Sequence, residues 1–404
     1  MLSRGGALCT IADLASLPGP RGVGMTPARV ATPAWYDVTW NPTAGCSPVG
    51  PGCAHCEALR TVAQLARIGG KAGARYAGLT ATGRSGSRWT GELRVRDDVL
   101  TWPLLQRRGR RILVDSLSDL FHEKLATETI DLIHAVMTIA HWHRFLILTR
   151  RAGLMRSYYD DPLTPQRIAV QIEHLAKAVM PELVSLPRAR GGDPGAIPVA
   201  SIAARRNWAA GLARVVRHEA APGGARSADT ALDPWPLPNL WLGVAVEDQD
   251  RAARVGELMQ TPAALRWVCF EPLLGPVRTD MVPLGNDCYA DALGGICFSL
   301  DGRGRRLAGP RPNLPALDWV IAGGETGAGA RPTDPDWLRD LRDRCRTAVV
   351  PFFFKQWGEW APAPDDQPTQ KMARRRRRAA GRLIDGRSWD ELPAAMRQGS
   401  RKPR

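Results

Sequence analysis

Three of the eight cysteines in this 404-residue chain lie close together in one short loop. Cys46, Cys53 and Cys56 have the spacing C-x6-C-x2-C, and the loop is rich in glycine and proline, which supply tight turns. Three thiolates suit a 4Fe-4S cluster in which one iron stays open for a substrate or cofactor. A structural zinc site takes four protein ligands, so the alternative is a zinc knuckle completed by a remote Cys or His.

Charged residues follow several apolar runs further along the chain. Glu247 and Glu271 come directly after such runs, as does Lys355, and Glu325 follows another run after two glycines. A single carboxylate at a strand end is usually a solvated cap or an ion-pair partner. Three carboxylates that face one mouth favour an active site, and we therefore expect these four residues to be catalytic.

The apolar runs themselves indicate a parallel sheet. Each run is short and nearly continuous, and stretches of helical spacing separate them, as in strands that are covered on both faces. A first strand leads from residue 34 into the cysteine loop, and later runs occupy residues 111–114, 144–148, 239–246, 266–270, 318–322 and 349–354. The chain is expected to be α/β, with a complete or partial (β/α) TIM-like barrel of about six to seven parallel strands. A flat Rossmann sheet is the alternative, but no G-x-G-x-x-G follows the first strand.

We assign the barrel domain to residues 34–362, and the remaining segments lie before it, within it as insertions, or after it. Residues 1–33 lack a compact apolar segment and are expected to be a flexible leader. Stretches near 185–236 and 281–313 exceed ordinary strand–helix connections and are expected to be insertions. Residues 363–404 are expected to form a basic tail with a short ordered segment near 381–392. No run of eighteen apolar residues occurs, so no membrane contact is expected.

The formal net charge of +15 favours contact with a polyanion such as nucleic acid. Five consecutive arginines, Arg374 to Arg378, account for part of this charge, and other basic residues are spread along the chain. The equal alternative is that these arginines only cover a solvated surface. The cysteines follow no regular framework in a chain of this length, which predicts a reducing, cytoplasmic environment.

A series of short motifs coincides with the predicted strand ends. They are Trp40-Asn41-Pro42, the cysteine loop, Ser116-Leu117-Ser118-Asp119-Leu120-Phe121, Leu148-Thr149-Arg150, Trp241-Leu242-Gly243-Val244 with Glu247-Asp248-Gln249, Phe270-Glu271-Pro272-Leu273-Leu274-Gly275, Gly323-Gly324-Glu325, and Phe354-Lys355-Gln356-Trp357-Gly358. Together they resemble an uncharacterised phage-associated family, described as a three-cysteine domain of unknown function, over residues 34–392 apart from the insertions. The cysteine loop of that family is similar to those of radical S-adenosylmethionine (SAM) proteins. This chain departs from the family at Glu57, where an aromatic residue is more common, and its loop differs from the C-x3-C-x2-C most common among radical SAM enzymes.

This resemblance implies a radical SAM-like iron–sulfur enzyme of unknown substrate, with a 4Fe-4S cluster on the three cysteines and SAM at the open iron. Such an enzyme needs an electron donor, and the basic charge points to a nucleotide or nucleic acid as substrate. The residues expected to bind the cofactor are polar groups and glycines at strand ends: Ser116, Ser118, Asp119, Thr149, Arg150, Gly323 and Gly324. Serine and aspartate after a strand have the alternative role of capping a helix.

Two other functions remain open. One is a zinc-dependent nucleic-acid-binding module in which the cysteines are structural, and the other is an iron–sulfur redox protein that uses no SAM. His122-Glu123 and His141-Trp142-His143 are not expected to form a second metal site, because alternating histidines point to opposite faces of a strand.

Overall fold

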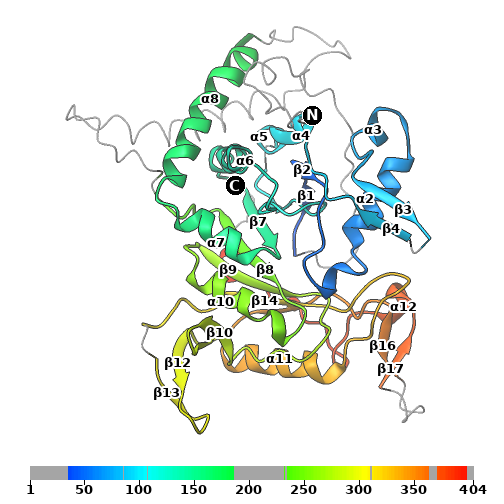
Figure 1. Cartoon of the computed structure of the whole chain (residues 1–404), viewed down its shortest axis with the longest axis vertical. Coiled ribbons are helices and arrows are strands. Elements are labelled where there is room, and N and C mark those ends of the chain that lie inside the picture. Colours follow the sequence, from blue (N-terminus) through cyan, green and yellow to red (C-terminus); the bar gives the residue numbers. More distant parts are fainter. Residues whose placement is uncertain are drawn as a thin grey trace, which may run out of the picture.

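The computed structural model describes residues 35–84, 86–106, 108–185, 232, 234–309, 312–363 and 371–397. Its centre is a seven-stranded parallel sheet in the order β1-β6-β7-β8-β9-β14-β15, which curls into a half-barrel (Figure 1). The strands are β1 (Val38–Trp40), β6 (Arg111–Val114), β7 (Arg144–Thr149), β8 (Leu240–Ala245), β9 (Leu265–Phe270), β14 (Trp319–Ala322) and β15 (Phe352–Phe354). The prediction of an α/β fold with a partial TIM-like barrel is confirmed.

Helices cover the outer face of the sheet and connect its parallel strands. They are α6 (Thr127–Ile139) after β6, α7 (Ala152–Asp160) and α8 (Thr164–Ser185) after β7, η2 (Gln249–Arg251) and α10 (Ala253–Gln260) after β8, and α11 (Pro335–Thr347) after β14. Buried side chains such as Ile133 and Leu338 pack against outward-facing strand residues such as Val244 and Val268 in one large core. This packing leaves the carboxyl ends of the strands free for polar groups, as in other parallel barrels.

The concave face of the half-barrel is filled by tryptophans. Trp241, Trp267 and Trp319 occupy alternate positions to the outward-facing residues on β8, β9 and β14, and each is at most 2% exposed. Trp35, just before β1, packs on them with its ring centroid 5.3 Å from that of Trp267. Gly243 makes room for the Trp267 indole, because a Cβ at this position would overlap the ring. The interior is therefore a packed floor, and any site must lie above it.

Between β1 and β6 the chain builds the surroundings of the cysteine loop. β2 (Thr43–Ala44) pairs with β5 (Arg94–Val95), and β3 (Thr80–Gly83) forms a hairpin with β4 (Gly86–Trp89). The remaining elements are η1 (Pro51–Cys53), α2 (Glu57–Arg67), α3 (Gly70–Ala74), α4 (Asp97–Leu100) and α5 (Trp102–Leu105). Leu59 and Val62 of α2 join Leu79 and Trp89 in a small separate core, which anchors the helix that begins after the last cysteine of the loop.

The region near 281–313 forms a separate antiparallel sheet. Its strands are β10 (Val282–Gly285), β11 (Cys288–Asp291), β12 (Ile296–Leu300) and β13 (Arg306–Ala308), paired in sequence order. The expected leader, residues 1–33, and most of the expected insertion near 185–236 lie outside the described residues. Within the described ranges, no helix combines the length and apolar character that crossing a membrane requires.

The chain after β15 packs back on the half-barrel. β16 (Trp360–Pro362) pairs with β17 (Met372–Arg374), and α12 (Arg377–Ala380) and α13 (Ala394–Arg397) follow. Ile384 and Trp389 are buried in the large core, and Phe354 N donates a hydrogen bond to Trp389 O (2.9 Å). The packed segment is thus longer than the expected 381–392. The structure also describes the arginine run in β17, in α12 and between them, with its side chains exposed.

Candidate functional site

The cysteine loop lies over the carboxyl ends of the parallel strands. Ser118, after β6, donates a hydrogen bond to Gly45 O (2.7 Å), and Arg331, after β14, donates one to Pro51 O (2.9 Å). Gly52 lies so close to the Glu247 carboxylate, after β8, that a Cβ would overlap it. These contacts fix the loop to three strand ends.

Arg151, after β7, holds Cys46 and its neighbour. Its Nη1 is 3.8 Å from Cys46 Sγ, and its Nη2 donates to Ser47 O (3.2 Å) and Ser47 Oγ (2.8 Å). The guanidinium also pairs with Asp119 Oδ2 at 3.1 Å and Glu123 Oε2 at 2.5 Å. Burial and the Asp119 carboxylate raise the pKa of the Cys46 thiol to about 12, and Arg151 offsets them only in part. At neutral pH this thiol is therefore protonated.

Arg150 interacts with the other two cysteines. Burial lowers the pKa of its guanidinium, but Glu247 and the thiolates of Cys53 and Cys56 outweigh burial and raise the pKa above its ordinary value. Its Nε donates to Glu247 Oε1 at 2.7 Å. The Cys56 thiolate also contributes to the raised pKa of Cys46. Arg151 therefore contacts Cys46, and the charge of Arg150 interacts with Cys53 and Cys56.

Successive side chains of a strand point to opposite faces of the sheet, and this alternation places one layer of polar side chains above the tryptophans. Arg150, Glu247, Glu271 and Lys355 all lie at this level of the concave face, one or two residues beyond the ends of β7, β8, β9 and β15. Arg150 Nη2 reaches Glu271 O at 3.5 Å, and Lys355 forms an ion pair with the Glu271 carboxylate. Gln356 Nε2 donates to the same carboxylate at 2.6 Å. Three of the predicted catalytic residues therefore belong to one connected network.

Glu325, the fourth, lies beyond this layer in the loop after β14. Arg331 binds its carboxylate through Nη2 to Oε1 (2.5 Å) and through Nε to Oε2 (2.8 Å). The same guanidinium donates to Pro51 O, so Glu325 is linked to the cysteine loop through one side chain. The structure brings Glu325 to the same mouth, although not into direct contact with the Glu271 network.

The two glycines after β14 permit close packing of the strand ends. A Cβ at Gly323 would stand 3.0 Å from Glu271 Oε1, and one at Gly324 would overlap Trp357 O. Neither position opens onto free space in this structure. Their use as a ligand cradle stays a prediction.

The polar residues expected to bind a cofactor hold neighbouring strand ends together. Ser116 Oγ donates to Asn41 Oδ1 (3.0 Å). Asp119 accepts hydrogen bonds from Thr149 Oγ1 (2.6 Å) and from Arg150 N (3.2 Å). With the bond that Ser118 makes to the loop, these contacts join β1, β6 and β7 into a frame beneath the cysteines. Cofactor binding by these side chains also stays a prediction.

Among the residues that the structure describes, no group of three or more His, Cys, Asp or Glu side chains is arranged to hold a metal ion. A single zinc ion draws its sulfur ligands to within about 2.3 Å of one centre, so the thiols are not gathered in that way. His55 packs over Gly329. The buried His143 accepts a hydrogen bond from Arg110 N (3.1 Å) and lies 3.0 Å from Pro103 O.

A match to a known protein family spans all residues of the candidate site. Residues 31–393 match a family described as "Protein of unknown function (DUF5131)". The chain belongs to this family. Neither the curated proteins nor the solved structures compared with it contain a match. The DUF5131 match spans the cysteine loop and every strand of the half-barrel, and it assigns neither a reaction nor a substrate.

Sequence reasoning did not select several residues of this DUF5131 site. Arg151 directly follows Arg150 at the same strand end, and that position is the sequence signal that could have identified it as a site residue. Arg254 lies on α10 and binds Glu247 Oε2 at 2.8 Å, whereas Arg331 lies in a loop. In sequence, both resemble ordinary solvated arginines, because nothing local marks a buried partner.

Asp115 is a further residue that the sequence did not single out. It directly follows β6 in a left-handed backbone conformation (φ 52°) and is 3% exposed. One carboxylate oxygen accepts a hydrogen bond from Thr43 N (2.9 Å), and Oδ2 has no partner among the described residues. Burial raises the pKa of this carboxyl from 3.8 to about 7.

Asp115→Asn is expected to stabilise this DUF5131 protein most above pH 7. The folded state holds the Asp115 proton more tightly than the unfolded chain, so the free energy of unfolding falls as the pH rises from 3.8 to about 7. Asparagine keeps the acceptor for Thr43 N, tolerates positive φ and carries no charge. At about 1.4 kcal/mol per unit of pKa difference, the gain is on the order of a few kcal/mol. Thermal unfolding at pH 4 and pH 8 measures it, and an equal gain at both pH values would contradict this account.

Proposed function

We propose that this chain is a radical SAM-like iron–sulfur enzyme whose cluster binds to Cys46, Cys53 and Cys56. The observation that carries the proposal is the position of these cysteines over the mouth of a parallel half-barrel, beside Arg150 and Arg151. Parallel barrels place their active sites at this end of the strands. The phage association implied by the sequence motifs belongs to the same proposal.

The residues present fit a 4Fe-4S cluster better than a zinc ion. Three thiols from one loop can bind three irons and leave the fourth open. A structural zinc ion usually takes a fourth protein ligand, which this loop does not supply as a cysteine. Thiolates and sulfides would give the centre negative charge, which the guanidiniums of Arg150 and Arg151 are placed to balance.

When bound, such a cluster supplies one-electron reduction of SAM and thereby hydrogen abstraction from a substrate. The chain's own residues hold and shield the reactants. The Glu271 carboxylate and the Lys355 ammonium, which pair with each other in this structure, would exchange partners to hold polar groups of SAM. The tryptophan floor excludes water from below.

The proposal also names a compartment and a partner. The seven cysteines that the structure describes are all free, in keeping with a reducing cytoplasm. Reduction of the cluster requires an external electron donor.

Anaerobic purification with iron and sulfide analysis tests the cluster, and incubation with SAM and dithionite tests the reaction. We expect about four irons and four sulfides per chain. We also expect a visible absorbance that air removes, and 5′-deoxyadenosine that depends on dithionite. Zinc without iron would overturn the proposal in favour of a zinc-dependent nucleic-acid-binding module. An iron cluster that yields no 5′-deoxyadenosine would instead indicate an iron–sulfur redox protein that uses no SAM.

A further inference from the structure

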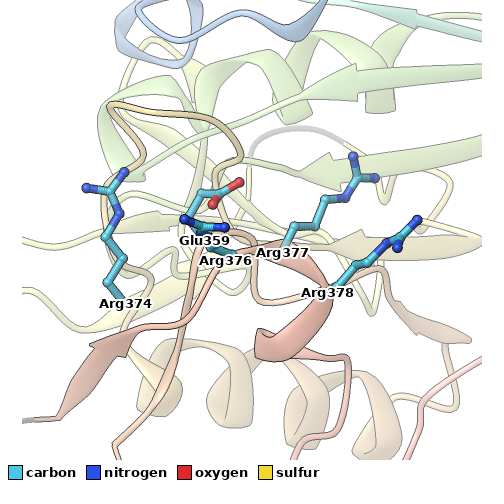
Figure 2. Close-up of a pocket in the computed structure, with 5 residues that line it drawn as sticks. All are labelled: Glu359, Arg374, Arg376, Arg377 and Arg378. Atoms are coloured by element: carbon cyan, nitrogen blue, oxygen red, sulfur yellow. The ribbon is translucent and has the colours of Figure 1, made fainter.

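A pocket of about 730 Å³ beside β16, β17 and α12 is lined mainly by arginines. Arg374, Arg376, Arg377 and Arg378 line it together with Glu359. Figure 2 shows Arg374 on one side of Glu359 and Arg377 and Arg378 on the other, with their guanidinium groups directed to the same side. All four arginines are exposed, so the pocket presents concentrated positive charge to solvent.

The fold leaves most of this charge available. Arg377 pairs with Glu57 at 3.4 Å, but the two side chains are 53% and 62% exposed, and water screens such a pair strongly. Arg376 and Arg378 have no ion-pair partner within the described part of the chain. Guanidinium groups that are close together and unpaired are suited to phosphate, which they bind in a fixed, bidentate geometry.

The backbone at Arg376 is strained. Its φ of 63° and ψ of 148° lie in a region that residues other than glycine rarely adopt. Strain of this kind costs stability and clusters at functional sites. Glycine would fit this position without strain, so the arginine side chain is present here at a cost to the fold.

A partly exposed tryptophan adjoins the pocket. Trp360 of β16 is the cross-strand partner of Arg374 in β17, so their side chains lie on the same face of this two-stranded sheet. The indole Nε1 donates to Ala330 O (2.7 Å), which fixes the ring. Arginines next to an aromatic ring are how many proteins hold single-stranded nucleic acid, with phosphates on the cations and a base on the ring.

The pocket is joined to the candidate active site on two sides. Glu57, the partner of Arg377, directly follows the last cysteine of the loop. Glu359 accepts a hydrogen bond from Gly327 N (3.1 Å), and its own backbone N donates to Glu325 O (3.1 Å). A strand held in the pocket would therefore lie next to the mouth of the half-barrel.

We propose that this pocket binds the phosphodiester backbone of a single-stranded nucleic acid and presents the strand to the half-barrel. Phosphates bind to Arg376, Arg377 and Arg378, and a base stacks on Trp360. The proposal rests on the proposed function for the reaction at the mouth, where the substrate is a nucleotide within a strand. Binding itself requires no cluster.

Fluorescence anisotropy of a labelled oligothymidylate, titrated with the full chain at several salt concentrations, tests this binding. The variant R376Q/R377Q/R378Q is expected to bind at least about tenfold more weakly at low salt. Its log–log salt dependence should be shallower by about 2, at about 0.7 per phosphate contact on a single strand. R303Q is the control, because Arg303 is an exposed arginine between β12 and β13. Figure 1 shows these strands on the opposite side of the view from β16 and β17, so this variant should bind like the wild type.

Arg376→Gly separates binding from folding. Release of the strained backbone should keep or raise Tm, while loss of the guanidinium should weaken binding and reduce the salt slope by about 0.7. A variant that folds well and binds poorly cannot be explained by misfolding. Wild-type affinity in R376G would overturn the assignment of Arg376.

Three results would overturn the proposal as a whole. The first is an unchanged affinity and salt slope in the triple variant. The second is binding of thymidine monophosphate or inorganic phosphate as tightly as the strand, which would make this a site for small anions. The third is equal binding of a duplex. Each differs from failure of the proposed function, which is measured by iron content and 5′-deoxyadenosine.

Discussion

Cys53→Ala is expected to remove nearly all iron from the anaerobically purified protein. Each cysteine of the loop would bind a separate iron of the cluster, and two thiolates hold a four-iron centre poorly. Cys46→Ala and Cys56→Ala should show the same loss, because no spare thiol lies among the contacts described for the loop. Iron and sulfide per chain, together with the visible absorbance, measure the effect.

Cys288→Ala and Cys297→Ala are the matched controls for this loss. Both cysteines are free and buried, on β11 and β12 of the antiparallel sheet. Each variant should keep its full iron content. If either lost iron to the same extent as the loop variants, the three-cysteine centre would have to be replaced by a larger or a second site.

Glu247→Gln is expected to have the largest effect on stability. The Glu247 side chain is 0% exposed, and its two oxygens bind Arg150 at 2.7 Å and Arg254 at 2.8 Å. Glutamine cannot neutralise two guanidiniums, and removal of one partner from a buried ion pair costs about 3–5 kcal/mol. Chemical denaturation of the full chain measures the loss. Because Arg150 also interacts electrostatically with Cys53, we expect iron loading to weaken in the same variant.

Asp160→Asn provides the comparison for an exposed pair. Asp160 binds Arg156 one helical turn away at 3.1 Å, and its side chain is 43% exposed. Pairs of this kind contribute well under about 1 kcal/mol. A loss in Glu247→Gln no greater than in Asp160→Asn would mean that Arg150 and Arg254 find other partners, contrary to a central role for Glu247.

The half-barrel was predictable because buried parallel strands are nearly continuous apolar runs. The predicted run at 318–322 corresponds closely to β14 (Trp319–Ala322). The run at 349–354 begins too early, since β15 starts at Phe352. Val349 has positive φ (56°) and is 87% exposed, and Pro351 has no amide hydrogen for a ladder. Apolar composition marks burial, but it cannot show where the backbone stops being extended.

The site was predictable only to the level of strand ends. A parallel sheet collects the groups that follow its strands, so the convergence of Glu247, Glu271 and Lys355 followed from the pattern of runs. Which of these side chains pair with each other could not be predicted, because the partners are far apart in sequence. Arg150 lies 97 positions before Glu247, and Lys355 lies 84 positions after Glu271. The sequence predicts the arginine run to lie in a basic tail, because charge alone carries no sign of where a segment packs. Burial of Trp389 further along the chain draws that segment onto the core.

Residues 389–391 lie along the outer side of β15, the last strand of the half-barrel. Phe354 N donates to Trp389 O (2.9 Å) and Glu391 N donates to Phe352 O (3.2 Å), so the segment covers backbone groups that a sheet edge would otherwise expose. Uncovered edges with large apolar side chains are where chains pair with one another and aggregate. Residues 389–391, which follow the arginine run in sequence, therefore protect this edge against pairing with another chain. A chain truncated before β17 would lose charge and edge protection together, whereas one that ends after α12 would keep the arginine run and lose only the edge protection.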